Sequence, residues 1–248
     1  MHSSKIEGRK VDGILVLELN NPPANTYTHE ILRELDEMLL DARFDENTHV
    51  IVLTGRLNHF FSAGGDLKVL VNKSLQYKYN FALHGQEVMC RMRNTPKLIV
   101  AAINGHAIGG GLELAMAADI RIARRDGGRV GLTEGNLGVM PGMGGTQMMP
   151  RLVSAAKALE RCSVSRQMSF EEALDVGLIH SIYEKPNYIG QVLEYARQFV
   201  PQACQIGKLK QAIYHGAECS LGIADILEVE NEASRRTVFR ENGVGFRE

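Results

Sequence analysis

The sequence has neither a long apolar run nor a strong excess of charge of one sign. No apolar stretch approaches the roughly 20 residues that a membrane-spanning helix needs, so we expect no membrane partner. The formal net charge of −1 gives no global basic field, which makes nucleic acid an unfavoured partner. The first ten residues lack the apolar core of a secretory signal, and we therefore expect a cytoplasmic protein.

Paired cysteines and nucleotide-binding signatures are also missing. The four cysteines show no CxxC or Cys/His spacing, so the sequence predicts neither a disulfide framework nor a zinc site. Reduced thiols in a cytosolic compartment fit this pattern. There is no Walker A lysine pattern and no GxGxxG turn after the first predicted strand, which disfavours nucleotide-binding folds.

What the chain does contain is an alternation of strand and helix patterns. A length of 248 residues with 44% hydrophobic content fits one large domain, or one domain with a smaller appendage. Short apolar runs predict strands, and apolar residues at helical spacing predict helices between them. This alternation is typical of an α/β fold. The predicted strands are 14–19, 50–55, 98–102 and 120–123, and the predicted helices are 28–43 and 77–93.

After about residue 150 helical patterns dominate. The predicted helices are near 154–161, 169–176, 188–199, 203–215 and 221–238, with one short strand near 179–182. The helix at 221–238 fits an oligomer contact and intramolecular packing about equally well. At the other end of the chain, Ile6–Arg9 fits either a protease-cleavable tag or the entry into a first strand.

Three glycine-rich segments stand out, at 62–68, 105–113 and 141–147. Any one of them could be only a tight turn, because glycine serves wherever the backbone needs a positive φ or a close approach. The second is more informative, since its glycines run directly into a helix-forming stretch that contains Glu113. A helix beginning there leaves its first N–H groups without partners and favours negative charge. Such donors would stabilise an oxyanion on a thioester carbonyl beside the Glu113 carboxylate.

A second carboxylate, Glu134, lies in an apolar stretch interrupted by glycines, 130–138. Desolvation there would raise its pKa and suit it to proton transfer near neutral pH. A glutamate in a surface turn is the competing interpretation. The spacing along the chain does not decide between the two.

Five motifs, taken in order, resemble those of the crotonase (enoyl-CoA hydratase/isomerase) family. Phe61–Lys68 and Asn104–Ala115 look like the family's first and second oxyanion-hole loops, and Gly138–Gln147 resembles its loop-to-helix turn. Asn21–Asn25 and Glu171–Ile179 fall in family order as well. The resemblance covers essentially the whole chain.

The resemblance implies an α/β fold of the ClpP/crotonase type. We expect a repeated ββα core over residues 1–190, which carries the CoA and active sites, and a helical C-terminal region over residues 191–248. In the family this region builds trimers, commonly paired into hexamers. The implied partner is an acyl-CoA thioester substrate, with no metal and no cofactor other than the coenzyme A of the substrate itself.

The resemblance also implies the roles of individual residues. The main-chain N–H groups of Gly65 and Gly110 would bind the thioester oxygen, and Glu113 and Glu134 would lie on either side of a water molecule. Lys68 would meet a phosphate of CoA. The positions that match the family's substrate and CoA contacts are Ala24, Ala63, Gly64, Asp66, Leu67, Lys68, Gly109, Pro141 and Gly142.

The implied reaction is the syn addition of water to a 2-enoyl-CoA. Glu113 would activate the water, and Glu134 would deliver a proton to the α-carbon. Double-bond isomerisation is the main alternative, because one carboxylate can shuttle the proton. Decarboxylation or hydrolysis of another acyl thioester stays open, since one fold serves many reactions. A non-catalytic RNA-binding relative belongs to a different class, which the near-neutral charge and the intact glutamate pair disfavour.

Overall fold

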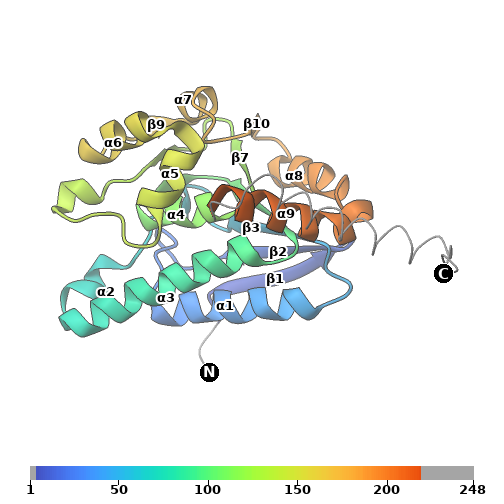
Figure 1. Cartoon of the computed structure of the whole chain (residues 1–248), viewed down its shortest axis with the longest axis horizontal. Helices are drawn as coiled ribbons and strands as arrows, with labels where there is room; N and C mark the ends of the chain where they lie inside the picture. Colours follow the sequence, from blue (N-terminus) through green and yellow to red (C-terminus); the bar gives the residue numbers. More distant parts are fainter. Residues whose placement is uncertain (1–3, 219–248) are drawn as a thin grey trace, which may run out of the picture.

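The computed structural model describes residues 4–218, which form two β-sheets surrounded by helices (Figure 1). The strands are β1 Ile6–Val11, β2 Ile14–Leu19, β3 Val50–Gly55, β4 Phe60–Ser62, β5 Leu98–Ile103, β6 His106–Ile108, β7 Ile120–Arg124, β8 Arg129–Gly131, β9 Met168–Ser169 and β10 Ser181–Tyr183. The helices are α1 His29–Phe44, α2 Leu67–Val71, α3 Leu75–Asn94, α4 Gly110–Ala117, η1 Glu134–Leu137, α5 Gly145–Val153, α6 Ala155–Ser163, α7 Phe170–Asp175, α8 Tyr188–Arg197, η2 Val200–Gln202 and α9 Ala203–Glu218.

The larger sheet has the strand order β1-β2-β3-β5-β7-β10 and is parallel except for β1. Helices cover both of its faces, so β3 and β5 are buried at every position and read as continuous apolar runs. Successive side chains along each strand point to opposite faces of the sheet. Leu17 and Leu53 pack in the cluster that contains α1 and α3, whereas Val16 and Val52 pack against α8. Figure 1 shows α1 and α3 side by side along the first face.

The smaller sheet repeats the order of the larger one. Its strand order is β4-β6-β8-β9, and β4, β6 and β8 are parallel. Along the chain, β3, β5 and β7 of the larger sheet are each followed by one strand of the smaller sheet (β4, β6 and β8) and then by a helix. Three consecutive units thus share a ββα pattern. This confirms the repeated core that the resemblance implied.

Most predicted elements agree with the structure within three residues at their ends. Residues 6–9, for which the sequence allowed either a protease-cleavable tag or the entry into a strand, begin β1. The sequence did not reveal the small sheet, because its strands are three residues long or shorter and show no alternation. β9 is accordingly a second strand beyond residue 150, where only one was predicted. The predicted helix at 221–238 lies outside the described residues.

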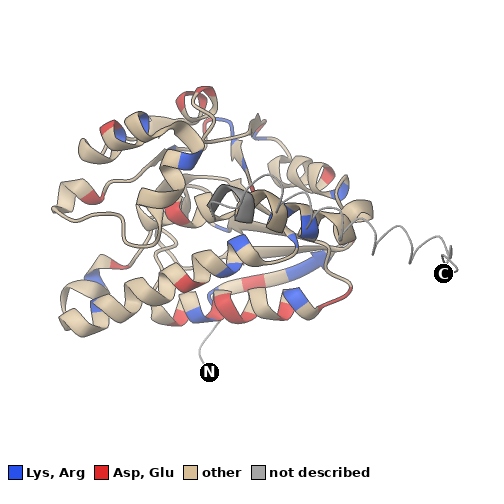
Figure 2. Ribbon diagram, in the orientation of Figure 1, with Lys and Arg blue, Asp and Glu red and all other residues tan. Residues whose placement is uncertain are grey.

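The surface carries charges of both signs. Figure 2 shows both acidic and basic residues along α1. Within residues 4–218, no helix combines the length and the apolar character that crossing a membrane would require. The charge pattern on α1 is typical of a helix with one face in water.

Helix α9 is attached to the core by a buried ammonium group. Lys210 is 6% exposed, and its Nζ donates to the main-chain oxygens of Met92 and Lys97 at 2.8 and 3.2 Å. It also donates to Oδ2 of Asp119 at 2.9 Å. The hydroxyl of Tyr214 donates to the other oxygen of Asp119 at 2.9 Å. These bonds fix α9 against the end of α3 and the start of β5.

We expect Lys210→Met to lower the free energy of unfolding by about 3 kcal/mol, because it leaves Asp119 buried without its ion-pair partner. Urea titration at pH 7 measures the loss. The control is Lys157→Met on α6, an exposed position where a change within about 0.5 kcal/mol is expected. A loss from Lys210→Met no larger than that of the control would contradict the assigned role of the ion pair.

Candidate active site

The glycine loops and Glu134 follow three neighbouring strands of the small sheet. Because β4, β6 and β8 are parallel, their carboxyl ends lie at one edge of the sheet. The segments 63–66, 109–111 and 132–134 leave these ends directly. Segments far apart in sequence thus meet at one edge, where ligands commonly bind in parallel sheets.

The first glycine loop is fixed by main-chain bonds to Tyr27. The N–H of Tyr27 donates to the oxygen of Gly64 at 2.9 Å, and its own oxygen accepts the N–H of Asp66 at 3.0 Å. In this parallel pairing Tyr27 bonds to the residues on either side of Gly65, so the N–H of Gly65 points away from Tyr27. Within residues 4–218, that N–H donates to no acceptor.

The second glycine loop begins helix α4. Gly109 has a φ of +55°, which favours glycine, and its oxygen accepts the N–H groups of Leu112 and Glu113 at 2.8 and 3.1 Å. The N–H of Gly110, the first residue of the helix, has no acceptor in the described part of the chain. A Cβ built on Gly64 would lie 2.8 Å from this nitrogen. The two loops are therefore in contact, and each supplies one N–H group that is free within the described part of the chain.

Glu113 is the more deeply buried of the two carboxyl groups, with 2% of its surface exposed. Its Oε1 accepts the N–H groups of Met143 and Gly145 at 2.9 and 2.7 Å. Burial raises the pKa of Glu113 to about 7, against the lowering effect of these two bonds, and the charge of Glu134 adds to the rise. The group can therefore exchange a proton near neutral pH.

Glu134 is half-buried at the start of η1. A Cβ built on Gly109 would lie 3.0 Å from Oε1 of Glu134, so this carboxyl group lies over the second glycine loop. Its Oε2 is buried and has no hydrogen-bond partner within residues 4–218. Burial raises its pKa, while main-chain N–H groups of Glu134 and Thr133 lower it. A buried oxygen without a partner is costly, and a substrate or water could supply one.

The two carboxyl groups face a common region. Glu134 raises the pKa of Glu113, and both carboxyl groups raise the pKa of the Cys162 thiol, where burial is the larger cause. Among the described residues, no cluster of three or more His, Cys, Asp and Glu side chains could hold a metal ion. The arrangement consists of two N–H donors and two carboxyl groups, which can stabilise an oxyanion and transfer protons.

The predicted substrate-binding positions are distributed along the same edge. The oxygen of Ala24 accepts the N–H of Ala63 at 3.0 Å, which joins the two segments. The carboxylate of Asp66 accepts the N–H groups of Lys68 and Val69 at 3.0 and 3.2 Å, and so caps α2. Asp66 thus has a structural use besides the predicted one.

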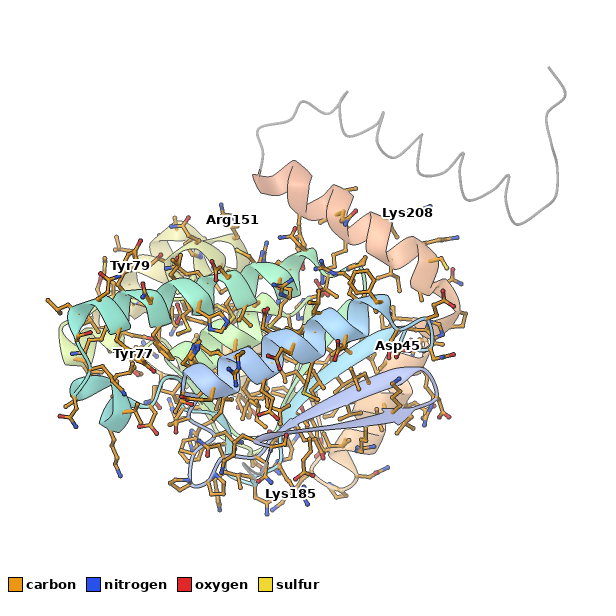
Figure 3. All side chains as sticks on the ribbon, turned by 90° about the horizontal axis from the view of Figure 1, so that it is seen from below. Asp45, Tyr77, Tyr79, Arg151, Lys185 and Lys208 are labelled. Carbon is orange, nitrogen blue, oxygen red and sulfur yellow. The ribbon has the colours of Figure 1, made fainter. Side chains whose placement is uncertain are left out.

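Beside this cap, α2 presents an exposed surface. Leu67 and Lys68 are exposed on α2, and Tyr79 is exposed on α3. In Figure 3, Tyr77 and Tyr79 come from the end of α3 that follows α2. An exposed lysine beside the first glycine loop is available to an anionic group of a ligand. Pro141 and Gly142 lie in the loop before α5, where the oxygen of Gly142 accepts the side-chain amide of Gln86 at 2.7 Å.

The sequence did not reveal two features beside the two carboxyl groups: the main-chain donors to Glu113, and the buried side chain of Tyr27. The N–H groups of Met143 and Gly145 hold Glu113, although the segment had been found as a loop-to-helix turn. Tyr27 is buried against Gly110, where a Cβ would overlap its hydroxyl oxygen. The only signal for Tyr27 was its position just after the motif at 21–25.

Comparison with solved structures gives the class of the fold. Two crystal structures match over nearly the whole chain: a protein from Geobacillus kaustophilus HTA426 (TM-score 0.92, 30% identity, 98% of this chain and 91% of that one) and an enoyl-CoA hydratase from Bacillus anthracis (TM-score 0.90, 29% identity, 96% and 92%). The fold is therefore the crotonase fold that the sequence motifs had predicted.

The family follows from the sequence. The family model described as Enoyl-CoA hydratase/isomerase matches residues 9–239, and the chain belongs to this family. It is 46% identical over 167 residues to the "Probable enoyl-CoA hydratase" of Bacillus subtilis (strain 168), covering 67% of this chain and 64% of that protein. It is 34% identical over 222 residues to the short-chain-enoyl-CoA hydratase of Clostridium acetobutylicum, covering 89% and 84%.

Proposed function

We propose that this protein adds water to the double bond of 2-enoyl-CoA thioesters. The observation that carries the proposal is that two N–H donors, from Gly65 and Gly110, both without an acceptor among residues 4–218, lie at the same sheet edge as two carboxyl groups of raised pKa. The relatives named enoyl-CoA hydratases support the same reaction.

In the proposed reaction, the thioester oxygen accepts the N–H groups of Gly65 and Gly110. These bonds draw electron density from the double bond and stabilise the enolate that forms as water attacks the β-carbon. Glu113 takes a proton from the attacking water, and Glu134 gives a proton to the α-carbon on the same face, which makes the addition syn. Transfer of a proton from Glu113 to Glu134 then restores the starting state. The reaction balances with water and the thioester alone, so we propose no further cofactor.

The binding of CoA is assigned to the edge that carries the glycine loops. We propose that Lys68, which is exposed on α2, meets a phosphate group of CoA. Ala24 and Ala63 lie on the paired segments beside it. We further propose a cytoplasmic homotrimer or homohexamer, with residues 1–190 as the catalytic core, residues 191–248 as the assembling region, and nucleic acid not among its partners.

Enoyl-CoA isomerisation is the second candidate. It requires one carboxyl group that takes a proton from one carbon and returns it to another. The observation in its favour is that Oε2 of Glu134 has no partner among the described residues, whereas Glu113 is already held by two N–H groups. The two reactions differ in whether both glutamates are needed.

The test of the proposal is the loss of enoyl absorbance when the protein is mixed with crotonyl-CoA and longer 2-enoyl-CoAs. A 3-hydroxyacyl-CoA product that takes its oxygen from labelled water supports hydration. Conversion of a 3-enoyl-CoA without uptake of labelled oxygen would identify an isomerase instead. If folded protein leaves every enoyl-CoA unchanged, the proposed function is wrong.

The pH dependence of hydration follows from Glu113. As the base, Glu113 must be ionised, and its pKa is raised to about 7. We therefore expect kcat/KM for crotonyl-CoA to follow a bell-shaped pH profile, falling toward low pH as Glu113 takes up a proton and toward high pH as Glu134 loses the proton that it must donate. Initial rates between pH 5 and 9 at constant ionic strength measure the profile. A rate that is flat from pH 5 upward would mean that Glu113 is not the base.

A further inference from the structure

The buried hydroxyl of Tyr27 has an unusually weak partner. Tyr27 is 2% exposed, its ring stacks on Phe81 with centroids 6.3 Å apart, and its hydroxyl donates to Sδ of Met143 at 3.3 Å. A thioether is a poor hydrogen-bond acceptor. A buried tyrosine hydroxyl usually donates to a stronger acceptor. Tyr188 is an example, because its hydroxyl donates to the main-chain oxygen of Ile122 at 2.6 Å.

Tyr27 contacts both loops that supply the N–H donors. Its main chain is paired with Gly64 and Asp66 on either side of Gly65. Its hydroxyl occupies the space where Gly110 would carry a Cβ, so only glycine fits at that position. Any change in the position of Tyr27 therefore acts on both donors.

The same residue is linked to Glu113 through Met143. The side chain of Met143 accepts the hydroxyl of Tyr27, and its main-chain N–H donates to Oε1 of Glu113 at 2.9 Å. Met143 itself has little freedom, because a Cβ built on Gly85 would overlap its side chain. The phenol, Met143 and Glu113 thus form one continuous chain of contacts.

The phenol remains neutral in this setting. Burial and then the charges of Glu113 and Glu134 raise the pKa of Tyr27 well above its ordinary value. The hydroxyl is therefore an O–H donor throughout the pH range in which the carboxyl groups titrate.

We propose that Tyr27 is a positioning residue for the acyl-thioester reaction: it fixes the N–H groups of Gly65 and Gly110 relative to Glu113. The assignment rests on the proposed function of these three groups. A residue that only filled the core would need its ring but not its hydroxyl. The hydroxyl is what contacts Gly110 and Met143, so its removal separates the two roles.

Tyr27→Phe, which keeps the ring, is the test, and Tyr188→Phe is the matched control. With crotonyl-CoA we expect Tyr27→Phe to lower kcat about tenfold while KM changes less than about twofold, because displaced N–H donors stabilise the enolate less well, although the loss is smaller than the roughly 10² to 10³ seen when one donor is removed. Infrared spectra of bound butyryl-CoA, which has no double bond to hydrate, report the polarisation of the thioester carbonyl. Its stretching frequency should move toward the value in water in Tyr27→Phe. Tyr188→Phe should lower Tm but change neither kcat nor the carbonyl frequency.

Met143→Leu removes the acceptor of the same bond and provides a second route if Tyr27→Phe folds poorly. We expect the double variant to lose no more activity than the more impaired single variant, because both changes break one contact. Losses that multiply would overturn the proposal. So would an unchanged kcat and carbonyl frequency in folded Tyr27→Phe. A wild-type protein that polarises butyryl-CoA but hydrates no enoyl-CoA would disprove the proposed reaction alone and leave the role of Tyr27 standing.

Discussion

Glu113→Gln is expected to lower kcat for enoyl-CoA hydration by about a thousandfold, because general base catalysis contributes roughly 10² to 10⁴ in rate. The amide oxygen of glutamine can still accept the N–H groups of Met143 and Gly145, so the site keeps its shape. The neutral amide cannot take a proton from water. The loss is therefore expected in kcat, with KM little changed.

The same substitution is expected to stabilise the protein above neutral pH. Folding raises the pKa of Glu113 from an ordinary 4.5 to about 7, so the folded state binds the proton more tightly than the unfolded state. Stability is then fully present below about pH 4.5 and falls as the pH rises through 7. Each pKa unit corresponds to about 1.4 kcal/mol, so ionised Glu113 costs on the order of 3 kcal/mol at pH 8.

Urea titrations of wild type and Glu113→Gln at pH 5 and pH 8 test this expectation. The gain should be largest at pH 8 and small at pH 5. The control is Glu87→Gln, an exposed position on α3, which should change neither stability nor kcat. A Glu113→Gln variant less stable than wild type at pH 8 would show that the carboxylate is not destabilising in the folded protein.

Glu134→Gln is expected to lower kcat for hydration by about a hundredfold or more, because the proton for the α-carbon has no other donor in the proposed reaction. Its buried Oε2 has no partner within the described residues, and glutamine keeps the size of the side chain, so the fold should tolerate the change. The measurement is initial rate together with incorporation of solvent deuterium at the α-carbon. Both should fall together.

Comparison of the two variants separates the candidate reactions. In a hydratase each substitution removes a required group, and the double variant loses little more than the worse single one, because the groups act as a unit. An isomerase would keep near-normal turnover of a 3-enoyl-CoA after Glu113→Gln. Normal hydration in both single variants would refute the assigned acid and base.

The predictability of the site differs from residue to residue. The helix beginning at Gly110, with Glu113 in its first turn, could be predicted because glycines precede a helix-forming stretch, and both features are local in sequence. Glu134 could not be placed in this way. Its position depends on the pairing of β6 with β8, two strands of three residues each, which have too few side chains to show a pattern.

In the rest of the fold, buried strands could be predicted from the sequence, whereas contacts between residues far apart in the chain could not. Strands β2, β3 and β5 of the larger sheet are mostly apolar along their length, so short apolar runs in the sequence revealed them. The contact between Tyr27 and Met143 joins residues 116 positions apart, and no local pattern marks it. The main-chain donors to Glu113 were likewise hidden, because an N–H group is present in nearly every residue and only the fold selects which ones point inward.

The ammonium of Lys210 also bears on the order in which the chain can fold during synthesis. It neutralises Asp119, made 91 residues earlier, and satisfies the oxygen of Met92, made 118 residues earlier. While the ribosome is still translating α8, the strands of the larger sheet have all been made, but this acidic group has not yet met its counter-ion. The ion pair that holds α9 to the core can therefore form only after α9 has emerged from the exit tunnel.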